Sequence, residues 1–181
     1  MKTLPGIPQI LFNRFYSIFR TLPCIFCTLA MASSVSAQET DNAMLKYGLN
    51  FLKTPYVAHT LEVNEEEKLV VNFDEVDCTT FVEYVLALAL SPVKNGTIDN
   101  ADYARTLQSI RYRDGKINGY TSRLHYIADW VNNGVRHGFM EDITAANSPD
   151  TVRLSLNFMS THPKAYKHLE SSPENISKIE E

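Results

Sequence analysis

The segment Asp77–Leu90, DCTTFVEYVLALAL, constrains the fold of this 181-residue chain more than any other stretch. It is apolar on nearly all sides of a helix, whereas a surface helix is apolar on one face only. Asp77 is a favourable N-cap, and Ser91-Pro92 ends the pattern because proline cannot continue a helix. The sequence therefore predicts a helix buried at the centre of the core.

Weaker patterns predict the elements around this helix. Further helices are expected over residues 42–53, 102–110 and 122–132. Core-facing side chains of the first are Met44, Tyr47, Phe51 and Leu52, and those of the last are Leu124, Ile127, Ala128 and Val131. Extended chain is expected at Tyr56–Val63 and a strand at Leu69–Phe73. Turns are expected at the charged triplet Glu65–Glu67, which should be solvated, and at Asp114-Gly115.

Composition excludes several functions. The chain carries 17 Lys+Arg against 21 Asp+Glu, a formal net charge of −4, which argues against a nucleic-acid-binding surface. It contains no H-E-x-x-H, its five histidines lack ligand-like spacing, and no Gly-rich loop follows a strand. We therefore predict one domain with neither a metal nor an organic cofactor.

The amino terminus has the pattern of a secretory signal peptide. Lys2, Arg14 and Arg20 are the only charged residues before position 38, and the apolar run Thr21–Ala32 precedes the small residues Ser33–Ala37. Residues 1–37 are predicted to be removed, which leaves an exported domain over residues 38–181 in the periplasm or outside the cell. The alternative is an uncleaved membrane anchor, but the run is shorter than the roughly 20 apolar residues that span a bilayer. No membrane span is expected after cleavage.

Export leaves Cys78 as the single thiol of the mature chain, because Cys24 and Cys27 lie in the apolar run. Asp77 as N-cap puts Cys78 in the first helical turn, where unpaired N–H groups and the helix dipole favour a thiolate. The same N–H groups could stabilise the oxyanion that forms when a thiolate attacks a carbonyl. The alternative is a small hydrophobic residue packed in the core.

The residues around Cys78 resemble a known family. Asp77–Glu83, DCTTFVE, resembles the D-C-[ST]-x-F-V segment of the NlpC/P60 cysteine peptidases and amidases. More narrowly, the chain is similar to the DUF1460 family of exported bacterial cell-wall amidases over roughly residues 42–145. Two further blocks carry this resemblance. They are Thr54–Val57 with Thr60–Glu62, and Tyr112–Gly115 with Gly119-Tyr120, Ser122–Tyr126 and Asp129-Trp130.

The resemblance implies a papain-like α+β fold in which the cysteine helix packs on an antiparallel sheet. It implies hydrolysis of the amide between N-acetylmuramic acid and L-alanine in peptidoglycan fragments, with Cys78 as nucleophile. The expected binding partners are therefore muropeptides. Asp77 and Thr79, which flank the nucleophile, are expected to contact substrate.

The general base is harder to assign, because no H-[VI]-G strand of the NlpC/P60 type follows Cys78. His125 is the best candidate, since Asp129 lies four residues later and could orient its ring if one helix held both. The alternatives for His125 are a pocket residue and a structural surface pair. Arg123, Tyr126 and Trp130 are expected to bind a polar, ring-bearing substrate alongside Asp129. The remaining histidines are expected in loops or on the surface: His59, His137, His162 and His168.

Two expectations concern whether this chain can catalyse the reaction. The family histidine is expected beyond residue 181, so that the sheet is incomplete and the chain is an inactive amino-terminal portion. A nucleophile without its base retains little amide hydrolysis. The alternative from another functional class is a non-catalytic module that binds muropeptides through Arg123, Tyr126 and Trp130.

Overall fold

The predicted central helix is present as α2, Cys78–Leu90, in the computed structural model, which describes residues 43–148, 152 and 155–179. Asp77 and Thr80 form a capping box. The Thr80 N–H donates to Asp77 Oδ1 at 2.7 Å, and the Asp77 N–H donates to Thr80 Oγ1 at 2.8 Å. At the other end the Ser91 hydroxyl donates to the Ala87 carbonyl at 2.6 Å. Most of α2 is buried, which confirms the prediction.

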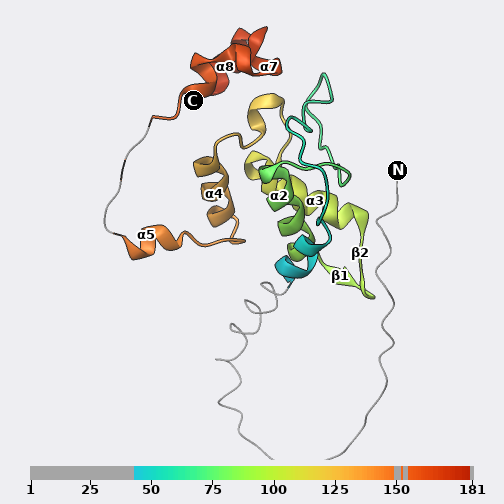
Figure 1. Ribbon diagram of the computed structural model, residues 1–181. Helices are drawn as coiled ribbons and strands as arrows, with labels where there is room; N and C mark the ends of the chain where they lie inside the picture. Colours follow the sequence, from blue (N-terminus) through green and yellow to red (C-terminus); the bar gives the residue numbers. More distant parts are fainter. Residues whose placement is uncertain (1–42, 149–151, 153–154, 180–181) are drawn as a thin grey trace, which may run out of the picture.

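Helix α3, Asn100–Arg111, packs against α2 and supplies the other side of the core (Figure 1). It begins where Asp99 accepts hydrogen bonds from the N–H groups of Ala101 and Asp102. The prediction of a helix over 102–110 is therefore confirmed, with two more residues at the start and one more at the end.

A short hairpin joins α2 to α3. Strand β1, Val93–Lys94, pairs antiparallel with β2, Thr97–Ile98, through a turn in which Asn95 and Gly96 have φ of 53° and 78°. Helices with one small antiparallel sheet are consistent with the α+β class. The expected packing of the cysteine helix on a sheet is not found in the described part of the chain, where α2 packs on α3 and the hairpin lies beyond its C-terminal end.

The main core lies between α2, α3 and the segments before α2. Its buried side chains are Val76, Tyr84, Leu86, Ala87, Leu88, Tyr103, Leu107 and Ile110. A helix over residues 43–49, which is shorter than predicted, and the turn after it pack Met44, Tyr47 and Phe51 against this core, as expected. Leu52 was expected to join them but is 69% exposed, because the helix has ended before it.

The predictions of extended chain over Tyr56–Val63 and of a strand at Leu69–Phe73 are wrong. Residues 58–63 form turns, and only Tyr56 makes an isolated bridge, to Val76. In the segment Leu69–Phe73, side chains of α2 and α3 make hydrogen bonds to backbone groups that a neighbouring strand would otherwise bind. Arg111 Nη1 donates to the Val70 carbonyl at 2.6 Å, and the Asn72 N–H donates to the Tyr84 hydroxyl at 3.0 Å. Tertiary contacts therefore decide the conformation of this loop.

The charged triplet before this loop is only partly solvated. The side chains of Glu65 and Glu66 are 91% and 86% exposed, as predicted, but that of Glu67 is 5% exposed. Glu67 Oε1 accepts a hydrogen bond from the Tyr112 hydroxyl at 2.7 Å and lies 3.6 Å from Arg123 Nε. A charge can be buried when it is paired in this way.

Two 3₁₀ turns and a helix follow α3. They are η1 Arg113–Gly115, η2 Tyr120–Ser122 and α4 Ile127–Arg136. Positive φ at Asp114 and Gly115 confirms the predicted turn. The predicted helix over 122–132 begins five residues late, because Leu124 is drawn into the core by a hydrogen bond from its N–H to the Arg111 carbonyl at 2.9 Å. Ile127 and Ala128 were expected to be buried, but both are exposed, Ile127 by 62%.

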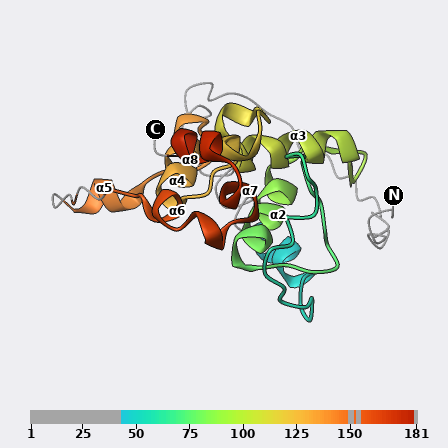
Figure 2. The ribbon, with the colours of Figure 1, turned by 90° about the horizontal axis from the view of Figure 1, so that it is seen from above.

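Short helices complete the described chain: α5 Ile143–Asn147, α6 Phe158–Thr161, η3 Pro163–Ala165, α7 Lys167–Glu170 and α8 Pro173–Ile179. Figure 2 shows α6, α7 and α8 close together, and α8 contacts both of the other two helices. A second small core holds them against η2 and is built on buried Tyr120, Met159 and Leu169. None of the helices in the described residues has the length and apolarity needed to cross a bilayer.

A buried ion pair connects α2 to α3. Arg111 Nε donates to Glu83 Oε2 at 2.7 Å, and the two side chains are 1% and 3% exposed. The Arg111 guanidinium also lies over the Tyr84 ring, 5.4 Å from its centre. Burial raises the pKa of the Glu83 carboxyl, and the adjacent Arg111 charge opposes that rise.

We predict that Glu83→Leu lowers the free energy of unfolding by about 3–5 kcal/mol, because it leaves the Arg111 charge buried without a partner. The double variant Glu83→Leu/Arg111→Met should recover most of this loss, since neither charge remains. Urea denaturation measures both. Glu174→Gln, which breaks the exposed Lys178 pair, is the control and should leave the midpoint unchanged. A single variant as stable as the double would contradict the prediction.

Candidate active site

Cys78 lies at the start of α2 with its side chain exposed and forms no disulfide. The first N–H groups of a helix have no acceptor within the helix, and here Asp77 takes the one from Thr80. The N–H groups of Cys78 and Thr79 therefore stand at the helix end beside the thiol. Thr79 Oγ1 is 4.0 Å from Cys78 Sγ. This arrangement suits a nucleophile and does not match a packed core cysteine.

Tyr56 lies beside Cys78, although the sequence did not predict it there. Residues 55–57 form a parallel bridge with the chain before Cys78: the Val57 N–H donates to the Val76 carbonyl, and the Val76 N–H donates to the Pro55 carbonyl, both at 3.0 Å. The charge of Cys78 raises the pKa of the Tyr56 hydroxyl, helped by desolvation, a hydrogen bond to Cys78 and the Asp77 charge. The one feature of the sequence that could have indicated Tyr56 is its place in the block Thr54–Val57, which carries part of the family resemblance.

The expected pair of His125 and Asp129 is wrong. His125 precedes α4, so the two residues do not share a helix. Asp129 instead forms a two-pronged ion pair with Arg113, with Nη–Oδ distances of 3.1 and 2.7 Å. The His125 Nε2–H donates to the Tyr120 carbonyl at 2.9 Å, and the two rings pack at 4.4 Å.

The environment of His125 keeps its ring neutral. Burial lowers the pKa of His125 to about 4, the nearby Arg123 charge acts in the same direction, and the hydrogen bond to Tyr120 opposes them. A base of such low proton affinity is poorly matched to catalysis near neutral pH.

The other four histidines lie beside residues other than Cys78 or in a turn. His137 lies 3.4 Å from Asp114, and His168 lies 3.2 Å from Glu62. His162 stacks on Phe158 at 4.2 Å, and His59 lies in the turn of residues 58–63. Among the described residues, none of the five histidines is hydrogen-bonded to Cys78. In the described part of the chain, the Cys78 thiol is therefore not hydrogen-bonded to any imidazole.

Arg123 was expected to face substrate, but its side chain is 7% exposed. It donates to Glu62, lies 3.6 Å from Glu67, and packs over the Tyr120 ring at 5.0 Å. Its backbone bridges to Tyr112. Arg123 thus ties together the blocks Thr60–Glu62 and Tyr112–Tyr126 that the sequence presents far apart.

The remaining predicted binding residues are also engaged inside the protein. The Tyr126 hydroxyl accepts a hydrogen bond from the Met159 N–H at 3.0 Å. Trp130 packs against the main core, and its buried Nε1–H has no acceptor among the described residues. The carboxylate of Asp77 is committed to the cap of α2, whereas Thr79 is exposed beside the thiol. Arg123, Tyr126 and Trp130 thus do not form an open binding face, which weighs against the binding-module hypothesis.

No group of three or more His, Cys, Asp or Glu side chains in the described ranges is arranged to hold a metal ion. The chemistry that can be read from these residues is that of a thiol nucleophile with first-turn N–H groups and a tyrosine hydroxyl beside it.

Comparisons with solved structures find close relatives. Two structures of an N-acetylmuramoyl-L-alanine amidase from Bacteroides uniformis are 62% and 59% identical to the chain, each with a TM-score of 0.72. The matches cover 75% and 77% of this chain. A Bacteroides fragilis structure assigned provisionally as a xylanase is 61% identical, with a TM-score of 0.71 over 75% of the chain. The chain spans 58% of the length of each of these relatives. A search of curated proteins found no match.

The comparison with protein families covers most of the described residues. The AmiA-like family, described as N-acetylmuramoyl-L-alanine amidase-like, matches residues 46–181. This range contains Tyr56, Cys78 and the Glu62–Arg123 pair. The chain therefore belongs to the AmiA-like family of N-acetylmuramoyl-L-alanine amidase-like proteins.

Proposed function

We propose that this chain forms the nucleophile-bearing part of a cysteine-dependent N-acetylmuramoyl-L-alanine amidase that acts on peptidoglycan fragments. The observation that carries the proposal is the exposed, unpaired thiol of Cys78 at the capped start of α2. The family and the amidase relatives support the same reaction. We propose further that the whole domain has the papain-like fold of the NlpC/P60 proteins, in which a sheet would complete the part described above.

The proposed reaction begins when the Cys78 thiolate attacks the carbonyl carbon of the amide that joins N-acetylmuramic acid to L-alanine. First-turn N–H groups of α2 stabilise the oxyanion, and the Tyr56 hydroxyl is a further donor beside the sulfur. Collapse of the tetrahedral intermediate breaks the C–N bond, and the leaving amine takes up a proton from a general acid. Water then hydrolyses the thioester, which frees the muramic acid carboxylate and restores the thiol.

A glycosidase is less well supported, although one relative is assigned provisionally as a xylanase. Glycoside hydrolysis uses two carboxyl groups that flank the scissile bond. Asp77, the carboxylate nearest to the thiol in the chain, is held in the capping box of α2. A cysteine at a helix N-terminus belongs instead to acyl-transfer chemistry.

We propose that the enzyme is exported through the signal peptide predicted over residues 1–37, which lie outside the described residues. Peptidoglycan lies outside the cytoplasm, which agrees with this route. Cleavage after Ala37 would start the mature chain at Gln38, and amino-terminal sequencing of the protein recovered from the cell envelope checks this.

We predict that Cys78 reacts with iodoacetamide at about pH 6 faster than the cysteine of an unstructured peptide, because helix N-terminal N–H groups favour the thiolate. Mass spectrometry of the mature chain over time gives the rate. The same chain in urea is the control and should react at the peptide rate. A folded chain that reacts no faster than the peptide would show that Cys78 is not activated.

We predict that this chain hydrolyses anhydro-muropeptides at least about 100-fold more slowly than the Bacteroides uniformis amidase, because none of the described histidines is hydrogen-bonded to Cys78 and general acid–base catalysis contributes roughly that much. Release of the peptide from a labelled muropeptide measures both proteins. Cys78→Ala and His125→Ala are the controls. Fast turnover that is lost in both variants would make His125 the base and refute this prediction.

We predict that the protein loses stability as the pH falls from about 6.5 to about 4, because His125 takes up a proton in the unfolded chain before it does so in the folded one. A histidine whose pKa is lower in the folded state than in the unfolded state destabilises the fold only below its unfolded pKa. The loss of stability grows as the pH falls to the folded pKa and then stays constant. Urea midpoints between pH 4 and pH 8 measure the effect. His125→Gln should flatten the profile, and His137→Gln, at an exposed site, should not. Equal slopes in all three proteins would contradict this account.

A further inference from the structure

The sequence contains three Asn-Gly pairs, and the structure places them in three different surroundings. They are Asn95-Gly96 in the β1–β2 hairpin, Asn118-Gly119 before η2, and Asn133-Gly134 inside α4. Glycine has no Cβ to shield its backbone nitrogen, so this nitrogen can attack the side-chain amide of the asparagine before it. The rate at which each pair reacts then depends on the freedom that the fold leaves to it.

The reaction is a deamidation that needs only water. The glycine nitrogen forms a bond to Cγ of the asparagine, and the side-chain nitrogen leaves as ammonia with the proton that the glycine nitrogen loses. Water then opens the resulting five-membered succinimide ring. Cleavage of its Cγ–N bond gives aspartate, whereas cleavage of the backbone C–N bond gives isoaspartate, in which the main chain continues through the former side-chain carbon.

Asn95 has the greatest freedom of the three asparagines. Asn95 and Gly96 are exposed, and the Asn95 side chain makes no hydrogen bond to the described residues. Each strand of the hairpin has only two residues, and a two-stranded hairpin by itself is marginally stable in water. Apart from the strand pairing, the turn is closed by Thr97 Oγ1, which donates to the Lys94 carbonyl at 3.0 Å. The turn can therefore open, and the succinimide ring can close, without unfolding of the core.

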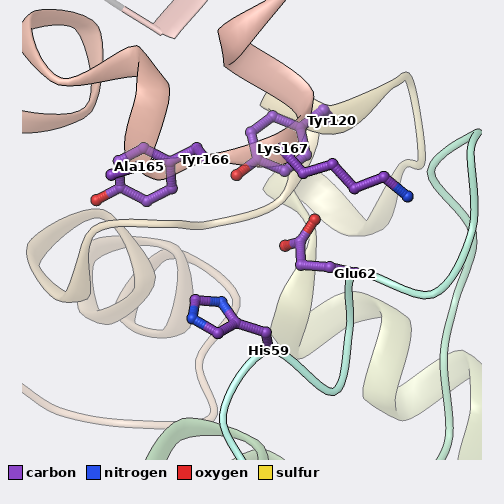
Figure 3. A pocket seen from close by; sticks show the side chains of 6 residues that line it. All are labelled: His59, Glu62, Tyr120, Ala165, Tyr166 and Lys167. Atoms are coloured by element: carbon purple, nitrogen blue, oxygen red, sulfur yellow. The ribbon is translucent and has the colours of Figure 1, made fainter.

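The turn at Asn118 is also exposed, but it is held more firmly. The Asn118 N–H donates to Ser122 Oγ at 2.9 Å, and the same hydroxyl donates to the Gly119 carbonyl at 2.7 Å. The next residue, Tyr120, is 5% exposed and lines a small pocket together with Tyr166 from the C-terminal segment (Figure 3). Opening of this turn therefore breaks hydrogen bonds and disturbs a buried side chain.

The third asparagine, Asn133, is fixed inside the protein. Its side chain is fully buried within α4. Its Oδ1 accepts a hydrogen bond from the Asp114 N–H at 3.1 Å, and its Nδ2 donates to the Ser109 carbonyl at 3.2 Å. Its Cγ cannot turn toward the Gly134 nitrogen unless α4 itself unfolds locally.

We propose that Asn95 is a site of spontaneous deamidation in the folded protein, and that reactivity falls in the order Asn95, Asn118, Asn133. The isoaspartate product adds one atom to the backbone of the turn and a negative charge. Because loop length fixes the register of a hairpin, the added atom disrupts the pairing of β1 with β2. It also frees Lys94, whose Nζ lies 2.8 Å from Asp102 of α3. The contacts between α2 and α3 do not involve the hairpin and remain.

The test follows deamidation while the folded chain is incubated at pH 8 and 37 °C. Trypsin releases the three sites on separate peptides, residues 95–105, 117–123 and 124–136, and mass spectrometry measures the deamidated fraction of each. Labelling by an isoaspartyl methyltransferase identifies the isoaspartate product. Asn95 should react at least about fivefold faster than Asn118, because its turn opens more readily, and Asn133 should stay intact. The same chain in urea is the control, in which the three sites should react at similar rates.

Two variants tie the rates to the structure. Asn95→Ser should remove the fast reaction from the peptide 95–105, which also contains Asn100. Ser122→Ala removes both hydroxyl hydrogen bonds of the second turn, so it should raise the Asn118 rate at least about threefold and leave the Asn95 rate unchanged.

An Asn118 or Asn133 rate equal to or above the Asn95 rate in the folded chain overturns the proposal. So does an Asn95 that stays intact in the folded chain over a period in which all three sites react in urea. Neither result bears on the amidase proposal, because deamidation is measured without substrate.

Discussion

The pair formed by Glu83 and Arg111 is the interaction on which the described structure depends most. Arg111 is the last residue of α3, yet its guanidinium reaches Glu83 in the middle of α2 and the Val70 carbonyl in the preceding loop. The backbone carbonyl of Arg111 accepts a hydrogen bond from the Leu124 N–H. One side chain and its backbone therefore connect α2, α3 and the loops on both sides. Burying two charges costs more than an apolar contact of the same size, so the advantage of this pair is that it specifies one arrangement of these parts.

Arg123 likewise connects segments that lie far apart in the sequence. It holds Glu62 and Glu67 on one side and packs on Tyr120 on the other, and its backbone pairs with Tyr112, the neighbour of Arg111. The two arginines thus connect the three sequence blocks of the family resemblance. These contacts explain why charged residues that lie far apart in the sequence are paired and mostly buried.

The sequence predicted what local interactions decide and missed what distant contacts decide. The cap at Asp77, the length of α2 and the turn at Asp114 depend on neighbouring residues, and all were predicted. Leu69–Phe73 has strand-forming side chains but is a loop, because Arg111 and Tyr84 take its backbone groups. Glu67 has the pattern of a solvated turn and is nevertheless buried by Arg123. No local pattern encodes these partners, which lie 12 or more residues away in the sequence.

The same distinction applies to the site. Cys78 could be recognised because its helix cap is local, whereas the His125–Asp129 pair failed because a contact of Leu124 with α3 delays the start of α4. Tyr56 reaches the thiol only through the bridge to Val76.

The position of Cys78, the proposed nucleophile, is therefore determined by the cap of α2 and by the bridge between Tyr56 and Val76, and none of the described histidines is hydrogen-bonded to its thiol. The groups that hold a thiolate and its oxyanion donors in place can differ from the groups that transfer protons during the reaction. A site built in this way can keep its nucleophile in position while the base comes from another part of the fold.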